Sequence, residues 1–215
     1  IMAILSAITM TIGNVLAIKQ SNIKRMLAYS TVAHAGFLMM GVAAIGSVAI
    51  SGGSSTGPSS VLFYLVAYAI TNLSAFFVVI AVSNHTNSEE ISSFTGLAKR
   101  SPILAVIMAF ALISLLGLPP AVGFMGKLYI FSAAVNSGLI WLVILGVVNS
   151  AISAYYYLRI IRFIYMVDTE TEERIHVSFI PMVTVCATGL AMLIFGIFPD
   201  SIILLAEKAT AILLM

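Results

Sequence analysis

The stretch 117–131, "GLPPAVGFMGKLYIF", interrupts an apolar segment that is otherwise typical of a membrane span. Two adjacent prolines remove two backbone N–H donors and cannot continue a helix, and the glycines around them permit sharp turns. A lysine follows with no acidic residue near it in sequence. The stretch therefore predicts a helix that breaks inside the hydrocarbon region beside a positive charge. The residues of this break are Pro119, Pro120 and Gly123, followed by Lys127.

Around this stretch the chain has the composition of a membrane protein. Of its 215 residues, 61% are hydrophobic and only 8% are charged, and the mean hydropathy is +1.13. Soluble domains carry about 25% charged residues, so a chain this poor in charge cannot keep a folded surface wetted. The net charge of +2, without a basic run interleaved with aromatics, argues against a nucleic-acid partner. We therefore expect an all-α polytopic membrane protein.

Six apolar segments are long enough to reach across a bilayer. Polar stretches join them, including the Gly/Ser-rich 51–60 and the acidic 168–176. The C-terminal piece 201–215 is apolar on one side, so we expect it to lie at the membrane interface or to finish the last helix. The first residues lack the charged leader of a signal peptide and look like the interior of a longer helix. The six segments are 1–18, 26–50, 60–83, 102–137, 139–165 and 177–199.

The segment 102–137 fits either two short helices that cross twice or one interrupted helix that crosses once. Basic residues favour the cytoplasmic loops of membrane proteins. A single crossing puts eight of the ten basic residues on one side, whereas a double crossing divides these eight into five and three. We therefore expect six spans with the fourth broken, basic loops in the cytoplasm and both ends of the sequence outside. The eight residues are Lys19, Lys24, Arg25, Lys99, Arg100, Arg159, Arg162 and Arg174.

Lys127 lies about eight residues past the middle of the broken segment, roughly 12 Å along a regular helix. This depth is still inside the hydrocarbon half-thickness of about 15 Å. One interpretation is that its flexible stem lifts the ammonium to the headgroups. The other is a proton relay, because a lysine beside a hydrated helix break can exchange protons. Depth alone leaves both interpretations open.

His34 lies nine residues beyond Arg25, which places it about 14 Å deep and near the midplane. Ser30 and Thr31 precede it by four and three residues, so all three share one helix face. A lone histidine is often a satisfied core residue. Here the polar face, and the unperturbed imidazole pKa of about 6.5, favour a part in proton exchange.

Two further spans carry polar side chains at every fourth position. Such groups are costly against lipid, so they are expected to point into the bundle. Hydrogen bonding between helices is the ordinary role of any one of them, but together they suggest an internal wet path for protons. The two rows are Tyr64, Tyr68 and Asn72, with Thr71 beside them, and Asn149, Ser153 and Tyr157.

The sequence carries no other recognisable chemistry. "GFMGK" (123–127) lacks the spacing of a phosphate-binding loop. The single Cys186 forms neither an internal disulfide nor, alone, a metal site. Paired carboxylates, Cys/His clusters and a dinucleotide-binding fingerprint are absent from the sequence. We therefore expect no redox cofactor and no metal on this chain.

Five stretches in this order carry a family resemblance: "NIKRMLAYSTVAHAGFLMMG" (22–41), "YAITNLSAFF" (68–77), "GLAKRSP" (96–102), "SLLGLPPAVGFMGKLYIF" (114–131) and "NSAISAYYYLRI" (149–160). Together they resemble the antiporter-like membrane subunit N of proton-pumping NADH:quinone oxidoreductase, respiratory complex I. Any one of them is shared with the sister subunits and with multisubunit cation/proton antiporters. The similarity covers nearly the whole chain.

The resemblance implies two inverted five-helix repeats, each with a broken helix. Residues 1–165 would be the second repeat, and 166–215 a cytoplasmic loop, the last membrane helix and an interfacial segment. The first repeat, with its glutamate–lysine pair, would be missing. Lys127 would be the outward-facing end of a proton relay that also includes His34 and Lys24.

The resemblance also implies partners and cofactors. The chain would lie in a bilayer, most simply a bacterial cell membrane, beside sister antiporter-like subunits. FMN, iron–sulfur clusters and quinone would belong in or near other subunits.

One departure helps to choose within the family. Sister subunits and antiporters carry a lysine where this chain has Asn72, which favours subunit N and leaves the central relay to water, tyrosine and His34. Three functions stay open: a proton-translocating subunit driven by distant electron transfer, a subunit of a Na⁺/H⁺ antiporter without a redox partner, and a scaffold that does not pump.

Overall fold

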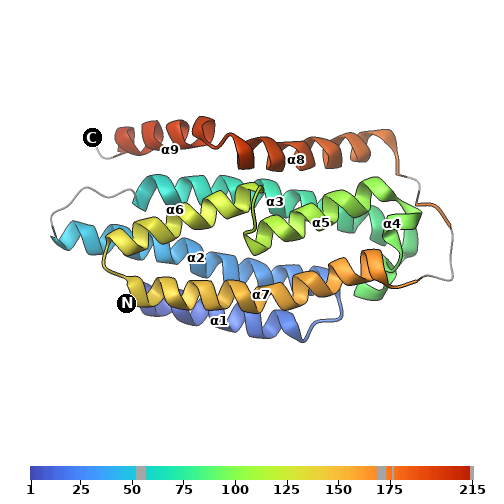
Figure 1. Cartoon of the computed structure of the whole chain (residues 1–215), viewed down its shortest axis with the longest axis horizontal. Coiled ribbons are helices and arrows are strands. Elements are labelled where there is room, and N and C mark those ends of the chain that lie inside the picture. The colour runs from blue at the N-terminus through green and yellow to red at the C-terminus, as the bar shows by residue number, and fades with distance from the viewer. Residues whose placement is uncertain (52–56, 169–172, 176, 214–215) are drawn as a thin grey trace.

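The structure is a computed structural model that describes residues 1–51, 57–168, 173–175 and 177–213. Its elements are helices, and the long ones run side by side along one axis (Figure 1). In chain order they are α1 (Met2–Ile18), α2 (Ile23–Ser51), α3 (Gly57–Thr86), the 3-10 helix η1 (Ile91–Phe94), α4 (Leu97–Arg100), α5 (Pro102–Leu116), α6 (Val122–Asn136), α7 (Ile140–Met166), α8 (Phe179–Ile197) and α9 (Asp200–Leu213).

Four helices of the described part are long and apolar enough to cross a bilayer: α2 over Ile23–Ser47, α3, α7 and α8. The helices α1 and α5 are apolar but shorter. Large apolar side chains such as Ile144 and Val106, each 59% exposed, cover the outer faces. Water does not tolerate so much apolar surface, whereas lipid tails cover it without cost. The prediction of an all-α integral membrane protein is confirmed.

The helices α1 and α2 form an antiparallel pair in very close contact. A Cβ added to Gly36 would lie 2.6 Å from the backbone nitrogen of Met10, and one added to Gly13 would lie 2.9 Å from the carbonyl oxygen of Tyr29. Ser6 Oγ also donates to the carbonyl oxygen of Gly36 at 2.7 Å. Small residues allow this approach, as is usual between membrane helices.

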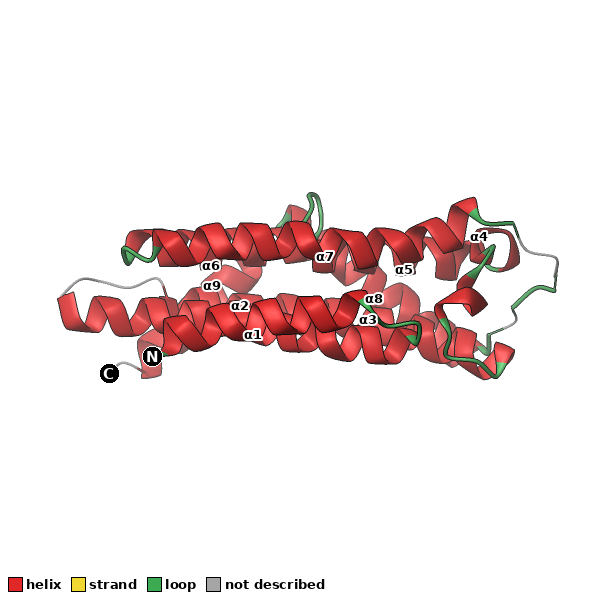
Figure 2. Cartoon of the chain, turned by 90° about the horizontal axis from the view of Figure 1, so that it is seen from below, coloured by secondary structure: helices red, strands yellow, loops and turns green. Residues whose placement is uncertain are grey.

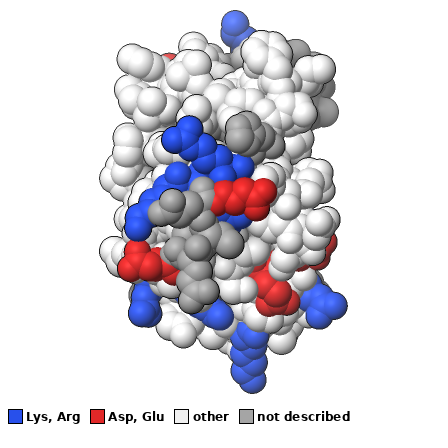
Figure 3. All heavy atoms as spheres, turned by 90° about the vertical axis from the view of Figure 1, so that its right-hand side faces the viewer, with Lys and Arg blue, Asp and Glu red and all other residues white. Residues whose placement is uncertain are grey.

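The two chain ends and the short loop helices occupy opposite ends of the bundle. The chain begins at α1 and ends at α9 on one side, and α4 lies at the other (Figure 1). The view from below also shows the loops around α4 gathered at that end (Figure 2). Lys, Arg, Asp and Glu side chains concentrate there (Figure 3). Lys99 pairs with Asp168 at 3.1 Å, and the buried Arg100 donates to the carbonyl oxygens of Ser93 and Glu173.

The ends of several elements differ from the sequence-based expectation. The stretch 51–60 was expected to be a linker, but Ser51 ends α2 and α3 begins at Gly57. Residues 52–56, and 169–172 and 176 of the acidic stretch, lie outside the described residues.

The segment 201–215, expected to lie at the membrane interface or to finish the last helix, contains most of α9, which lies lengthwise along α3 and continues the direction of α8 (Figure 1). The physical reason is its apolar face, since Ile202 and Ala206 are buried. Residues 214–215 are not among those described.

Candidate functional site

The helices α5 and α6 follow one another along the bundle axis and are separated by residues 117–121 (Figure 1). The helix α5 ends where Gly117 adopts a left-handed conformation, with φ of 87°, and its N–H bonds back to the carbonyl oxygens of Ile113 and Ser114. Glycine tolerates this conformation because it has no Cβ. Pro119 and Pro120 follow on the exposed side, and α6 begins at Val122.

The interruption leaves polar groups without helical partners, and side chains supply them. The last carbonyls of a helix have no N–H partner within it. At the break, the carbonyl oxygen of Leu116 accepts a hydrogen bond from Lys127 Nζ at 2.8 Å. On the α6 side, the N–H of Gly123 donates to Ser114 Oγ at 3.1 Å. One lysine and one serine thus supply hydrogen bonds to backbone groups on the two sides of the break.

Lys127 is buried, with 5% of its surface exposed. Besides Leu116, its Nζ donates to Ser150 Oγ on α7 at 3.1 Å and lies 4.9 Å from the ring centroid of Phe37. Both ion pairs found among the described residues lie elsewhere, so no described carboxylate neutralises this ammonium. The negative end of the α5 dipole and the aromatic face favour a positive charge at this place. The structure therefore places Lys127 inside the bundle, not among headgroups.

His34 is the centre of a second polar group. Its Nδ1 is hydrogen-bonded to the hydroxyl of Tyr64 at 2.6 Å and its Nε2 to the hydroxyl of Tyr157 at 3.3 Å. The hydroxyl of Tyr157 is in turn hydrogen-bonded to Ser30 Oγ. The ring of Tyr68 stacks on the imidazole, 4.9 Å between centroids. We call these five residues, from α2, α3 and α7, the His34 cluster.

A cavity of about 10 Å³ adjoins the His34 cluster at the helix break. This is close to the space that one water molecule needs, roughly 10–15 Å³. Polar groups line it from both sides, among them Thr71 Oγ1 and Ser114 Oγ, which are hydrogen-bonded to each other at 3.0 Å. The cavity thus brings α3 and the end of α5 within reach of the imidazole.

A third polar group connects α7 with α1. The hydroxyl of Tyr156 donates to Asn14 Oδ1 at 2.8 Å, and Asn14 Nδ2 donates to Asn149 Oδ1 at 3.0 Å. Asn149 Nδ2 then donates to Thr11 Oγ1 at 3.2 Å, on the exposed face of α1. The rings of Tyr156 and Tyr157 meet edge to face at 4.4 Å, so this group touches the His34 cluster.

Most of the residues predicted from the polar rows point inward, but Asn72 does not belong to the cluster. Its side chain is half-buried and makes no hydrogen bond with the described residues, whereas the hydroxyl of its neighbour Thr71 is buried and hydrogen-bonded. The reason is the helix period. Seven residues from Tyr64 bring Thr71 back to within about 20° of the same direction, but eight residues carry Asn72 about 80° away. Ser153 is buried and donates to the carbonyl oxygen of Ser150, on its own helix.

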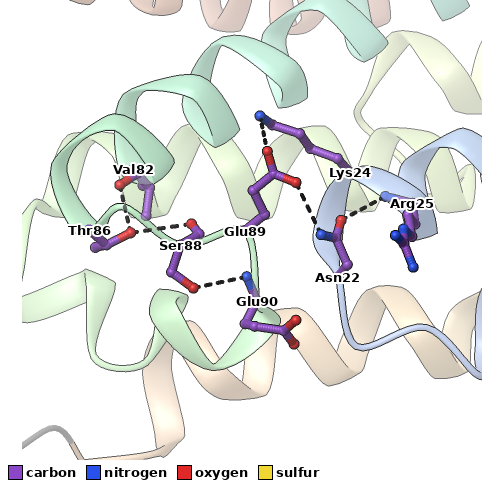
Figure 4. A network of polar contacts seen from close by, with 8 residues as sticks. All are labelled: Asn22, Lys24, Arg25, Val82, Thr86, Ser88, Glu89 and Glu90. Atoms are coloured by element: carbon purple, nitrogen blue, oxygen red, sulfur yellow. Dashed lines mark hydrogen bonds and ion pairs between the residues drawn. The ribbon is translucent and has the colours of Figure 1, made fainter.

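Lys24 lies apart from the other predicted residues, at the end of the bundle near α4. Its Nζ is 2.6 Å from a carboxylate oxygen of Glu89, and the two side chains are 37% and 45% exposed. Asn22 Nδ2 donates to the same carboxylate at 3.1 Å (Figure 4). These hydrogen bonds, first that from Lys24, hold the pKa of the Glu89 carboxyl below its usual value. Lys24 therefore fastens the loop after α3 to the start of α2 and makes no contact with the His34 cluster.

Sequence reasoning missed several residues of the site. Ser150 and Phe37 contact Lys127, and Asn14 and Tyr156 connect α1 with the centre. Asn14 carries the one amide side chain in the first span, residues 1–18, and this could have identified it from the sequence. Phe37 is an ordinary apolar residue of a membrane span, so nothing in the sequence distinguished it from other core residues.

Long apolar helices with buried polar side chains between them define a polytopic, helical membrane protein. The chain belongs to the family "NADH:quinone oxidoreductase/Mrp antiporter, TM", whose model matches residues 1–153. Among the described residues, no group of three or more His, Cys, Asp or Glu side chains is placed to hold a metal ion.

Curated relatives are similar over nearly the whole chain. It is 47% identical to NADH-quinone oxidoreductase subunit N of Dehalococcoides mccartyi, over 100% of this chain and 44% of that protein. It is 42% identical to the subunit N of Heliobacterium modesticaldum, over 98% of this chain and 42% of that protein. The chain therefore spans less than half the length of these relatives.

Solved structures share the fold. A chain of respiratory complex I from Thermus thermophilus with bound aureothin superimposes with a TM-score of 0.80 at 31% identity, over 94% of this chain and 44% of that one. A chain of the Mrp complex from Dietzia superimposes with a TM-score of 0.86 at 21% identity, over 98% of this chain and 46% of that one. At that identity, the Mrp likeness concerns the fold alone.

Proposed function

We propose that the chain is part of a proton-translocating membrane subunit of a redox-driven NADH, or related donor, quinone oxidoreductase. Protons pass through a relay of Lys127, His34 and the surrounding hydroxyl groups, while electrons pass through other subunits. The observation that carries this proposal is the ammonium of Lys127, buried at the end of α5 without a described carboxylate. The names of the subunit N relatives support the redox partner.

The partners of Lys127 suit both of its charge states. The ammonium has three N–H donors, which meet the carbonyl oxygen of Leu116, Ser150 Oγ and the face of Phe37. The neutral amine keeps two N–H donors and gains a lone pair, to which the hydroxyl of Ser150 can turn and donate. Either state therefore leaves few polar groups unpaired, as a group that gains and loses a proton in each cycle requires.

The His34 cluster has the chemistry of a proton relay. Each imidazole nitrogen faces a tyrosine hydroxyl, and a hydroxyl both donates and accepts. A proton received at one nitrogen can leave from the other, while the hydroxyls reverse their direction. Tyr68, Thr71 and Ser114 extend the polar lining toward the helix break. Asn149 and Lys24, assigned to the relay from the sequence, serve it in this proposal by holding elements together, and Ser153, also assigned to it, bonds within α7.

The finer membrane layout follows from the same proposal. The chain crosses the bilayer six times, with α5 and α6 as the two halves of one crossing. Residues 1–165 form the five-helix repeat, and 166–215 the loop and the last membrane helix. The end of the bundle near α4 faces the cytoplasm of a bacterial cell, in keeping with its basic residues.

Other components belong to partner subunits. Sister antiporter-like subunits adjoin the chain in the membrane, and FMN, iron–sulfur clusters and quinone are held in or near other subunits. The alternative is a subunit of a Na⁺/H⁺ antiporter without a redox partner. Co-purification of flavin- and iron–sulfur-containing polypeptides supports the first function. Their absence, with sodium transport driven by a gradient, supports the second.

The test is proton pumping by the assembled complex that contains the full-length Lys127→Met variant. Methionine keeps the length and the apolar volume but carries no exchangeable proton. We expect the number of protons pumped per electron to fall, with assembly preserved. Lys208→Met, on an exposed part of α9, is the matched control. Unchanged pumping by the Lys127 variant would favour a scaffold that does not pump.

A further inference from the structure

One buried aromatic ring, that of Phe37, contacts both halves of the site. Lys127 Nζ lies 4.9 Å from its centroid. From the same ring centroid, the imidazole of His34 is 6.0 Å away and the ring of Tyr64 is 6.5 Å away, both between centroids. Phe37 is 3% exposed, within a small apolar cluster of α1, α2, α3, α6 and α7. An apolar ring thus touches the ammonium and the imidazole at the same time.

The hydrogen bonds of the described side chains do not connect these two groups. Those of Lys127 lead to the carbonyl oxygen of Leu116 and to Ser150. Those of His34 lead to the two tyrosine hydroxyls. Proton transfer needs a donor and an acceptor about 2.6–3.2 Å apart, or one bridging water. The ring of Phe37 offers neither a donor nor an acceptor at this point.

We propose that Phe37 is a gate in the proton path between Lys127 and the His34 cluster, an inference that rests on the proposed relay function. In the observed conformation its ring packs against both groups, which no hydrogen bond of the described side chains connects. When the ring turns aside, one proton leaves Lys127 Nζ and is taken up by a ring nitrogen of His34, over a hydroxyl or a water that enters the opened space. Lys127 becomes a neutral amine and His34 a cation. The reverse step restores both.

The position of the ring makes the gate responsive to the charge of the lysine. A cation is attracted to the face of an aromatic ring, whereas a neutral amine gains much less. The charged Lys127 therefore holds the ring in the closed position, and the ring turns aside against this attraction when the proton passes to His34. An aliphatic residue of similar size fills the space but lacks this response.

The test uses the assembled complex with the full-length chain in liposomes. Passive proton flux is measured under a potassium diffusion potential set with valinomycin, with quinone reduction inhibited. Phe37→Ala removes the ring, and Phe37→Leu keeps most of its apolar volume. Phe63→Ala is the matched control, because Phe63 is 1% exposed and packs against Tyr129 with no contact to Lys127 or His34 among the described rings.

We expect Phe37→Leu to raise the passive flux about fivefold, the factor that corresponds to about 1 kcal/mol. Phe37→Ala should raise it at least as much, and Phe63→Ala should leave it unchanged. If Phe37→Ala does not assemble, Phe37→Leu decides, since substitutions that conserve volume are tolerated best. An unaltered flux in Phe37→Leu overturns the gate, and so does an equal rise in Phe63→Ala. Normal pumping by Lys127→Met instead overturns the relay, so the two failures are distinguishable.

Discussion

Replacing Gly117 by alanine tests whether the helix break holds Lys127 in place. Gly117 has a φ of 87°, and a Cβ added to it would lie 2.7 Å from Cδ of Lys127 and 3.4 Å from Nζ. The substitution therefore strains the backbone and pushes the lysine stem away from the end of α5.

The two effects differ in size and can be separated. A left-handed conformation costs a non-glycine residue about 1–2 kcal/mol. Displacing the ammonium loses hydrogen bonds to Leu116 and Ser150, each of which contributes about 1.5–3 kcal/mol because one partner is charged. Gly138 is the matched control: its φ is 76°, and a Cβ there would have no atom within 4 Å. Gly138→Ala therefore carries the backbone strain alone.

The assay compares assembly and proton pumping of the two variants in the complex. Gly138→Ala should assemble slightly less well and pump the normal number of protons per electron. Gly117→Ala should lower that number by half or more in the complexes that do assemble, an order-of-magnitude expectation from the loss of two charged hydrogen bonds. Equal pumping by both variants would refute the reasoning, because it would mean that the position of the lysine stem does not matter.

Three further changes test other parts of the structure. Lys24 holds the pKa of Glu89 below its usual value, so their ion pair stabilises the fold fully above the unfolded-state pKa of about 4.3. This stabilisation is lost as the pH falls through the lower folded-state pKa. Glu89→Gln should therefore weaken the dependence of the thermal unfolding temperature on pH in this acidic range, measured in detergent. Asn14→Leu removes two buried hydrogen bonds to α7 and should lower the free energy of unfolding by about 1–3 kcal/mol, measured by denaturation in detergent. Thr71→Val should reduce pumping per electron and Asn72→Leu should not, and equal effects would contradict the observed helix register.

The sequence predicted the region of the interruption but not what closes it. Two prolines after a glycine exclude a regular helix in any environment, and the structure ends α5 at Leu116 and begins α6 at Val122. That the two halves make one crossing stays a prediction. The hydrogen-bond partners at the break could not be predicted, because Ser150 belongs to another helix and nothing in the sequence distinguishes the carbonyl of Leu116 from other carbonyls.

The rows of polar residues were likewise predicted only in part. A spacing of four residues approximates one helix turn, so the rows correctly placed Tyr64, Tyr68 and Tyr157 inside the bundle. Each step of four residues rotates the side-chain direction by about 40° around the helix axis. After two steps from Tyr64, Thr71 and not Asn72 therefore points inward. Only contact with neighbouring helices decides how wide the inward face is.

Whether Lys127 turns toward headgroups or toward the interior was open on depth alone. The stem is flexible enough for both, and the sequence contains no acidic residue nearby to attract it. The choice follows from the carbonyl left free by the break and from Ser150 and Phe37 on adjacent helices.

Composition and the length of the apolar segments determined that this protein belongs in a bilayer and is helical, because transfer from water to lipid is nearly a sum over residues and lipid satisfies no backbone polar group. The tertiary structure decided which polar side chains meet and what they donate to. Hydrogen bonds depend on distances of about 3 Å between groups far apart in sequence, and only the packing of helices sets such distances.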